Sequence, residues 1–196
     1  MKQYRDVVFT EDELKGQAFE NCEFIKCRFV NASFRFTSFK KCVFQTCDLS
    51  SNVFDVTTFS TCSFPESKLS NLDFTQTHLD MCNFTGAIMK YCVFQSMKPG
   101  SPFERKKMDL KTCIFIDADL TGSVFNHCDL SQVSFANANL ESVVFDTCWL
   151  RGTNLIGANI QGVNFTASKL EHTLLDMDGF ITFGNSKGFV MDGQIS

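Results

Sequence analysis

Ten cysteines and three histidines are the residues of this sequence that could support metal binding, disulfide formation or nucleophilic catalysis. The cysteines recur at separations of five and twenty residues, as in Cys22, Cys27 and Cys42. A zinc knuckle needs cysteines about two to four residues apart, and no histidine lies in register with these pairs. The spacing therefore predicts small apolar core residues in a reducing compartment. Successive sulfurs could approach disulfide range under oxidation, but nothing in the sequence requires it. We expect no metal and no cofactor.

Other catalytic arrangements are also missing from the sequence. His78, His127 and His172 have no serine or cysteine at a spacing that suggests a nucleophile relay. His78 lies close to Asp80, which alone is weak support for acid–base work. No GxGxxG, GxxxxGK or HExxH motif occurs. We therefore expect that the protein is not an enzyme.

A five-residue repeat explains the cysteine spacing. Seventeen consecutive apolar residues follow at intervals of five from Leu14 to Phe94, and the series resumes in a shifted frame from Leu110 to Leu175. Nineteen of the 23 phenylalanines, counting Phe9 and Phe180 just outside these limits, occupy such centres. A period of five fits neither the 3.6 of a helix nor the alternation of a strand. The sequence is therefore built from a repeat of its own kind.

The position two residues before each centre holds small residues, and all ten cysteines sit there. Each unit thus has one large inward residue, one small inward residue and three that face solvent. Four units make a square coil of 20 residues, with neighbouring coils about 4.8 Å apart. The centres predict about eight coils. Replacing Cys62 with serine is expected to destabilise the protein by about 1–3 kcal/mol, because the hydroxyl would be buried without a partner.

The pattern closely resembles that of the pentapeptide-repeat family, A(D/N)LXX with leucine or phenylalanine at the centre. Clear instances are FENCEFIKCRF, TCDLSSNVF and FIDADLTGSVFNHCDL, and the resemblance covers about residues 9–175. The resemblance implies an all-β fold, a right-handed quadrilateral parallel β-helix. Its handedness is implied by the resemblance alone.

The solenoid is expected to form one domain with capped ends and one interruption. The tail is expected to be an irregular lid or short hairpin over the last coil, and the alternative is a dimer interface. The expected segments are an N-terminal cap (1–13), coils (14–94), a loop excursion (95–109), further coils (110–175) and a C-terminal cap or dimer contact (176–196).

Two sets of surface residues are candidates for binding a partner. The first is the basic cluster Arg105, Lys106 and Lys107 in the interruption, which is either functional or a tolerated insertion. The second is an outer column that forms if eleven residues loop out: His78, Asp109, Asp129, Trp149 and Lys169. Trp149, the only tryptophan, stands where the repeat wants a polar residue. It is either a protein-contact hot spot or covered by the C-terminal tail.

Charge is distributed in bands along the chain, whose net charge is −4. Residues 14–46 carry six basic and two acidic residues, a net of +4; residues 47–80 carry one and five, a net of −4. Residues 109–150 carry one and six, a net of −5. The acidic bands could meet a basic groove, or they are simply solvating residues. We expect no direct contact with nucleic acid. Without a long apolar run or a signal peptide, we expect a cytoplasmic protein that does not enter a membrane.

The resemblance also suggests a function. Members of the quinolone-resistance group of the family bind DNA gyrase or topoisomerase IV as acidic mimics of DNA, and protect the enzyme from quinolones or toxins. The loop and the acidic bands are consistent with this. Residues 176–196 do not resemble the amphipathic C-terminal helix through which those relatives dimerise. The alternatives are a rigid scaffold for an unknown protein partner and a secreted effector.

Overall fold

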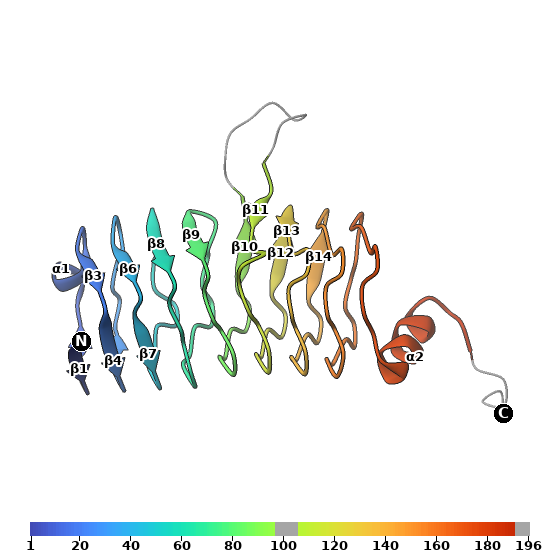
Figure 1. Ribbon diagram of the computed structural model, residues 1–196, viewed down its shortest axis with the longest axis horizontal. Coiled ribbons are helices and arrows are strands. Elements are labelled where there is room, and N and C mark those ends of the chain that lie inside the picture. Colours follow the sequence, from blue (N-terminus) through green and yellow to red (C-terminus); the bar gives the residue numbers. More distant parts are fainter. Residues whose placement is uncertain (97–105, 191–196) are drawn as a thin grey trace.

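Short parallel strands stack into a rod in the computed structural model, which describes residues 1–96 and 106–190 (Figure 1). Every strand pair is parallel. Among the described residues, two sheets have three strands each: β1 (Lys2–Arg5), β4 (Cys22–Ile25) and β7 (Val43–Gln45) form one, and β10 (Val93–Gln95), β12 (Val124–Asn126) and β14 (Val144–Asp146) form the other. A four-stranded sheet consists of β3 (Ala18–Glu20), β6 (Ser38–Lys40), β8 (Thr57–Ser60) and β9 (Thr77–Asp80). Two further sheets have two strands each, β2 (Val8–Phe9) with β5 (Arg28–Phe29), and β11 (Met108–Asp109) with β13 (Cys128–Asp129).

The strand register is 20 residues, as in the pairing of Phe24 with Phe44. Because apolar centres recur every five residues, each coil has four of them, and the predicted four-sided parallel β-helix is confirmed. The solenoid makes about seven turns. The predicted count of about eight included the first coil, which the short helix α1 (Glu11–Leu14) interrupts.

One shift of register locates the interruption. Phe94 pairs with Phe125, 31 residues away, whereas Met108 pairs with Cys128 at the usual separation of 20. The difference of eleven residues equals the loop length inferred from the sequence, and it falls between Gln95 and Met108. Within the predicted excursion 95–109, residues 97–105 lie outside the described part of the chain.

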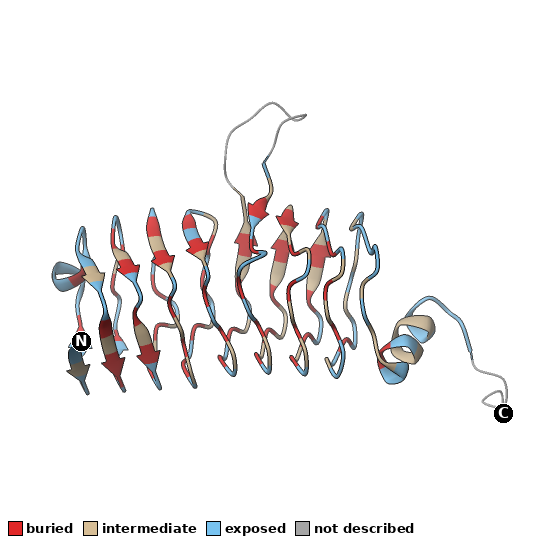
Figure 2. Cartoon of the chain, viewed as in Figure 1, coloured by how far each residue is buried: buried red, intermediate tan, exposed pale blue. Residues whose placement is uncertain are grey.

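Stacked phenylalanine rings fill the rod. Phe44 and Phe64 lie parallel with ring centroids 5.0 Å apart, and Phe64 stacks on Phe84 at 4.9 Å. Rings in neighbouring columns meet edge to face, as Phe59 meets Phe64. Aromatic pairs favour both geometries. The inward positions are almost completely buried along most of the rod (Figure 2). Burying each such side chain contributes about 1.5–3 kcal/mol.

The corners of the coil have left-handed backbone. The residue two positions after a centre has a φ near +50 to +70° in most units, for example Lys26, Met81 and His127. This region is sterically unfavourable for residues other than glycine. Many corners are nevertheless not glycine, so the ladder and the buried centres impose the conformation rather than the local sequence.

The small inward positions share one hydrogen-bond pattern, which corrects the expectation for Cys62. Its thiol lies 3.4 Å from the carbonyl of Phe39, 23 residues earlier. Ser67 at an equivalent position donates its hydroxyl to the carbonyl of Phe44 at 2.7 Å. A serine at position 62 therefore has an acceptor in reach.

We now expect Cys62→Ser to change the unfolding free energy by less than about 1 kcal/mol, because the buried hydroxyl would be satisfied. Urea denaturation of the two proteins measures this difference. A loss above about 2 kcal/mol would show that the serine hydroxyl does not reach the carbonyl.

The C-terminal cap differs from the predicted irregular lid or hairpin, because residues Met177–Ser186 form the helix α2. The Asp176 carboxylate caps it by accepting a hydrogen bond from the Gly179 N–H at 2.8 Å. It also accepts one from the Gly157 N–H at 2.7 Å, which ties the helix to the coil. Phe183 meets Phe165 edge to face at 5.9 Å. The capping aspartate and this apolar contact outweigh the poor helix propensity of the glycines.

Candidate protein-binding site

The strand register places Asp109, Asp129, Trp149 and Lys169 of the predicted column on one outer face, whereas no pairing among the described residues joins His78 of β9 to them. Asp109 pairs with Asp129, Asp129 with Trp149, and Trp149 with Lys169. The Trp149 side chain is 42% exposed, so the described part of the C-terminal segment does not cover it. A large indole thus faces solvent in a column whose other members are polar.

Two lysines flank the Trp149 ring. The Nζ atom of Lys107 lies 5.2 Å from the ring centroid and that of Lys169 lies 5.8 Å from it, both within cation–π range. Lys107 also contacts Nδ1 of His127 at 3.5 Å and donates to the Thr147 carbonyl. Partial burial lowers the pKa of Lys107 below its ordinary value. We call Lys107, Trp149 and Lys169 the Trp149 cluster.

The strand ladder is split beside this cluster. In the described residues, no strand pairing and no backbone hydrogen bond joins β9 to β11. The Met81 N–H donates instead to the Thr112 hydroxyl at 2.9 Å. Backbone bonding between the two coils resumes where the Ile114 N–H meets the Cys82 carbonyl at 3.0 Å. We call the interval between β9 and β11 the split.

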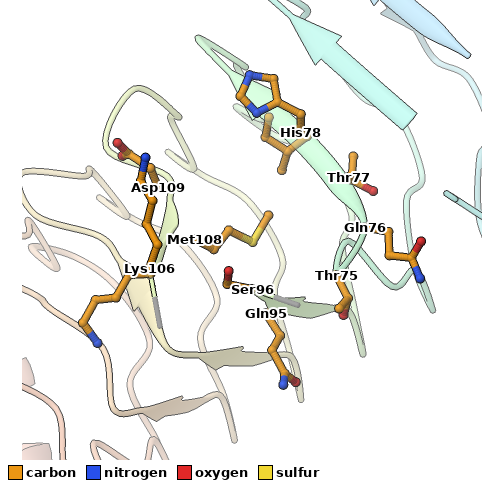
Figure 3. Close-up of a pocket in the computed structure, with 11 residues that line it drawn as sticks. Thr75, Gln76, Thr77, His78, Gln95, Ser96, Lys106, Met108 and Asp109 are labelled. Carbon is orange, nitrogen blue, oxygen red and sulfur yellow. The ribbon is translucent and has the colours of Figure 1, made fainter. Parts of the chain in front are cut away.

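A pocket of about 800 Å³ occupies the split (Figure 3). Among the predicted site residues, the structure brings His78, Lys106, Lys107 and Asp109 to its lining, whereas Asp129 and Trp149 belong to the neighbouring coils. Arg105 lies outside the described residues. Sequence reasoning missed the contributions of Thr75, Gln76, Thr77, Gln95, Ser96 and Met108.

Ion pairs offset part of the acidic bands. Lys111 lies 3.5 Å from the carboxylates of both Asp109 and Asp129, and these raise its pKa. Lys90 contacts Asp119 at 3.0 Å. Three of the six acidic residues of the 109–150 band therefore have a basic neighbour. Exposed pairs of this kind add little stability, but they reduce the charge that a basic partner would meet.

The cysteines occupy the core, where all ten are buried and free. Burial raises the pKa of the Cys47 and Cys92 thiols to about 12. Among the described residues, no group of three histidine, cysteine or acidic side chains is placed to hold a metal ion. These thiols act as small packing residues.

The C-terminal end of the rod exposes apolar side chains. Met177 and Phe180 of α2 are 74% and 67% exposed, and Leu170 and Leu174 on the last coil are also exposed. A cluster of exposed apolar side chains often marks a contact with another protein.

Two family models match the sequence. Residues 106–177 match a pentapeptide repeat region, and residues 18–50, 27–64 and 67–98 match pentapeptide repeats in eight copies. No curated protein matches the chain. Among the described residues, no helix is long and apolar enough to span a membrane.

The fold is shared with two QnrB1 structures over almost the whole chain. A trypsin-treated variant of QnrB1, a plasmid-mediated fluoroquinolone resistance protein, is 16% identical, with a TM-score of 0.55, and the match covers 98% of this chain and 99% of that one. A second such variant is 17% identical, with a TM-score of 0.54 and 97% of each chain covered. HetL from the cyanobacterium Nostoc sp. strain PCC 7120, a repeat protein involved in the regulation of heterocyst differentiation, is 16% identical, with a TM-score of 0.39 and coverage of 90% and 88%.

Proposed function

The chain belongs to the pentapeptide-repeat family, and we propose that it is a non-enzymatic rod that binds a protein partner through the Trp149 cluster. The observation that carries the proposal is the half-exposed Trp149 ring held between Lys107 and Lys169. Tryptophan is among the residues most enriched in binding hot spots. Other apolar side chains, among them Phe36, are exposed on the rod, but Trp149 is held between two lysines.

The surroundings of the ring define the chemistry of the partner. The two lysines fix the ring and leave a positive rim, which favours a partner with an apolar pocket bordered by carboxylates. The indole stands on a coil whose inward residues are completely buried, so little order has to be created on binding.

A type II topoisomerase is the first partner to test, which makes the chain a candidate protector of gyrase or topoisomerase IV in the cytoplasm. The fold shared with QnrB1 over nearly the whole chain supports this candidate. The net charge of −5 over residues 109–150 supports the DNA-mimic form of the proposal. The contacts of Lys111 and Lys90 count against a continuous acidic face.

A supercoiling assay with purified gyrase, with and without ciprofloxacin, tests this candidate. We expect the wild-type protein to inhibit supercoiling or to rescue it from the drug, and Trp149→Ala to lose most of that effect. No effect of the wild-type protein at micromolar concentration would remove gyrase as the partner.

We further propose that the exposed apolar residues of α2 and the last coil form a homodimer contact. Sedimentation equilibrium should then give twice the chain mass of 22.1 kDa. A single chain mass at all concentrations up to 100 μM or so would contradict this contact.

A further inference from the structure

The split leaves two strand edges facing each other. β9 pairs with β8 on one side and β11 pairs with β13 on its far side, while β9 and β11 do not pair with each other. Figure 1 shows β11 standing farther from β9 than β9 stands from β8. Unpaired strand edges are templates for adding another strand.

Met108 offers a physical reason for the split. It occupies the small inward position two before Leu110, where the adjacent coils of the same column hold Thr77 and Cys128. The thioether is buried at the edge of the pocket. A methionine is larger than a threonine, so at this position it fills space that the neighbouring strand β9 would otherwise occupy. The Met108 side chain thereby holds β11 away from β9.

Thr77 shows a second irregularity next to the split. Its side chain lines the pocket and the residue is only 8% exposed, yet its hydroxyl has no hydrogen-bond partner among the described residues. The equivalent hydroxyl of Thr57 donates to the Phe34 carbonyl at 2.8 Å. A buried hydroxyl without a partner is unusual, so the regular hydrogen bonding of the small inward positions is also broken at the split.

The volume of the pocket is that of a short extended segment. A strand residue occupies about 3.3 Å along the chain, 4.8 Å between strands and 10 Å between packed layers, so 800 Å³ corresponds to about five residues. Figure 3 shows Thr77 and His78 on one side of the pocket and Met108 and Asp109 on the other.

We propose that the split is a binding site for an extended peptide segment of a partner protein, inserted between β9 and β11 as an additional parallel strand. Its backbone bonds the two open edges, as in other cases of strand addition. A small inward side chain of the segment meets Met108. The inference rests on the proposed function only in that the segment belongs to a protein partner.

Fluorescence anisotropy with a short probe tests the site without that partner. The probe is fluorescein-labelled DADLTG, which copies residues 117–122 of this chain and therefore suits a coil position. The control is DAPLTG, in which proline removes the central N–H and cannot complete the ladder. We expect saturable binding of the first peptide, and at least tenfold weaker binding of the second.

Met108→Thr provides the matched protein variant, because a small residue should let β11 pair with β9 and close the site. We expect it to bind DADLTG at least tenfold more weakly, while Phe36→Ala, at an exposed corner outside the pocket, binds it as wild type does. If Met108→Thr fails to fold, the two-peptide comparison with the wild-type protein decides. Absence of saturable binding at millimolar peptide, or equal binding of both peptides, would overturn the proposal. Because the peptide assay contains no partner protein and the supercoiling assay contains no peptide, failure of the peptide site is distinguishable from failure of the proposed function.

Discussion

Replacing Phe84 with alanine is expected to lower the unfolding free energy by about 3–5 kcal/mol, the usual cost of removing a buried aromatic ring. Its ring is completely buried and stacks on Phe64 at 4.9 Å and on Phe115 at 5.2 Å. The alanine would leave a gap in the middle of the column. Each coil of a solenoid is stabilised only by its neighbours, so the rod should also lose cooperativity at this point. Urea denaturation should show a lower midpoint and a shallower slope.

Phe36→Ala is the matched control, because this phenylalanine lies at a corner and is 56% exposed. We expect a change within about 0.5 kcal/mol. Equal losses for the two variants would mean that the ring stack does not carry the stability of the rod.

The ten cysteines are expected to resist a thiol reagent such as Ellman's reagent at pH 8 in the folded protein, and all to react after denaturation. Burial raises the pKa of Cys47 and Cys92 to about 12, so their thiolate fraction at pH 8 is on the order of a thousandfold below that of an ordinary cysteine. Reaction then requires local opening of a coil. Rapid reaction of several thiols in the folded protein would contradict the buried columns.

The same pKa shifts make the protein sensitive to alkaline pH. Below pH 9 or so both states hold the thiol proton, and stability is unaffected by these groups. Above it the unfolded chain releases protons that the folded chain keeps, so the unfolding free energy falls as the pH rises from about 9 toward 12. Thermal melts across this range measure the effect.

The fold was predictable because two sets of positions, the apolar centres and the small residues two before them, both recur every five residues. The loop length was predictable for the same reason, since it is the offset between two frames. The corner conformation was not, because non-glycine residues such as Lys26 and Met81 adopt left-handed backbone only under the constraint of packing. Helix α2 was not predicted, because its glycines have poor helix propensity and Asp176 was not recognised as its N-cap.

The candidate site could be predicted only in part. The register fixes which residues share a column, so Trp149 and Lys169 were found together. The approach of Lys107 to Trp149 depends on the path of the chain after the loop, which no repeat specifies. One feature of the sequence pointed to the split, namely the large residue Met108 at a position where the repeat has small residues. Only the strand pairing in the structure shows that β9 and β11 do not pair there.

The most direct test of the proposed function is quantitative affinity capture, with crosslinking, of partners from a lysate of cells that express the protein. The compared baits are wild type, Trp149→Ala combined with Lys169→Ala, and Phe36→Ala as a control for an exposed aromatic residue elsewhere on the rod. We expect one protein to be crosslinked to wild type and to the Phe36→Ala bait, and its recovery to fall at least tenfold with the bait that carries Trp149→Ala and Lys169→Ala. Equal recovery with all three baits, or no protein crosslinked to any of them, would contradict binding through the Trp149 cluster.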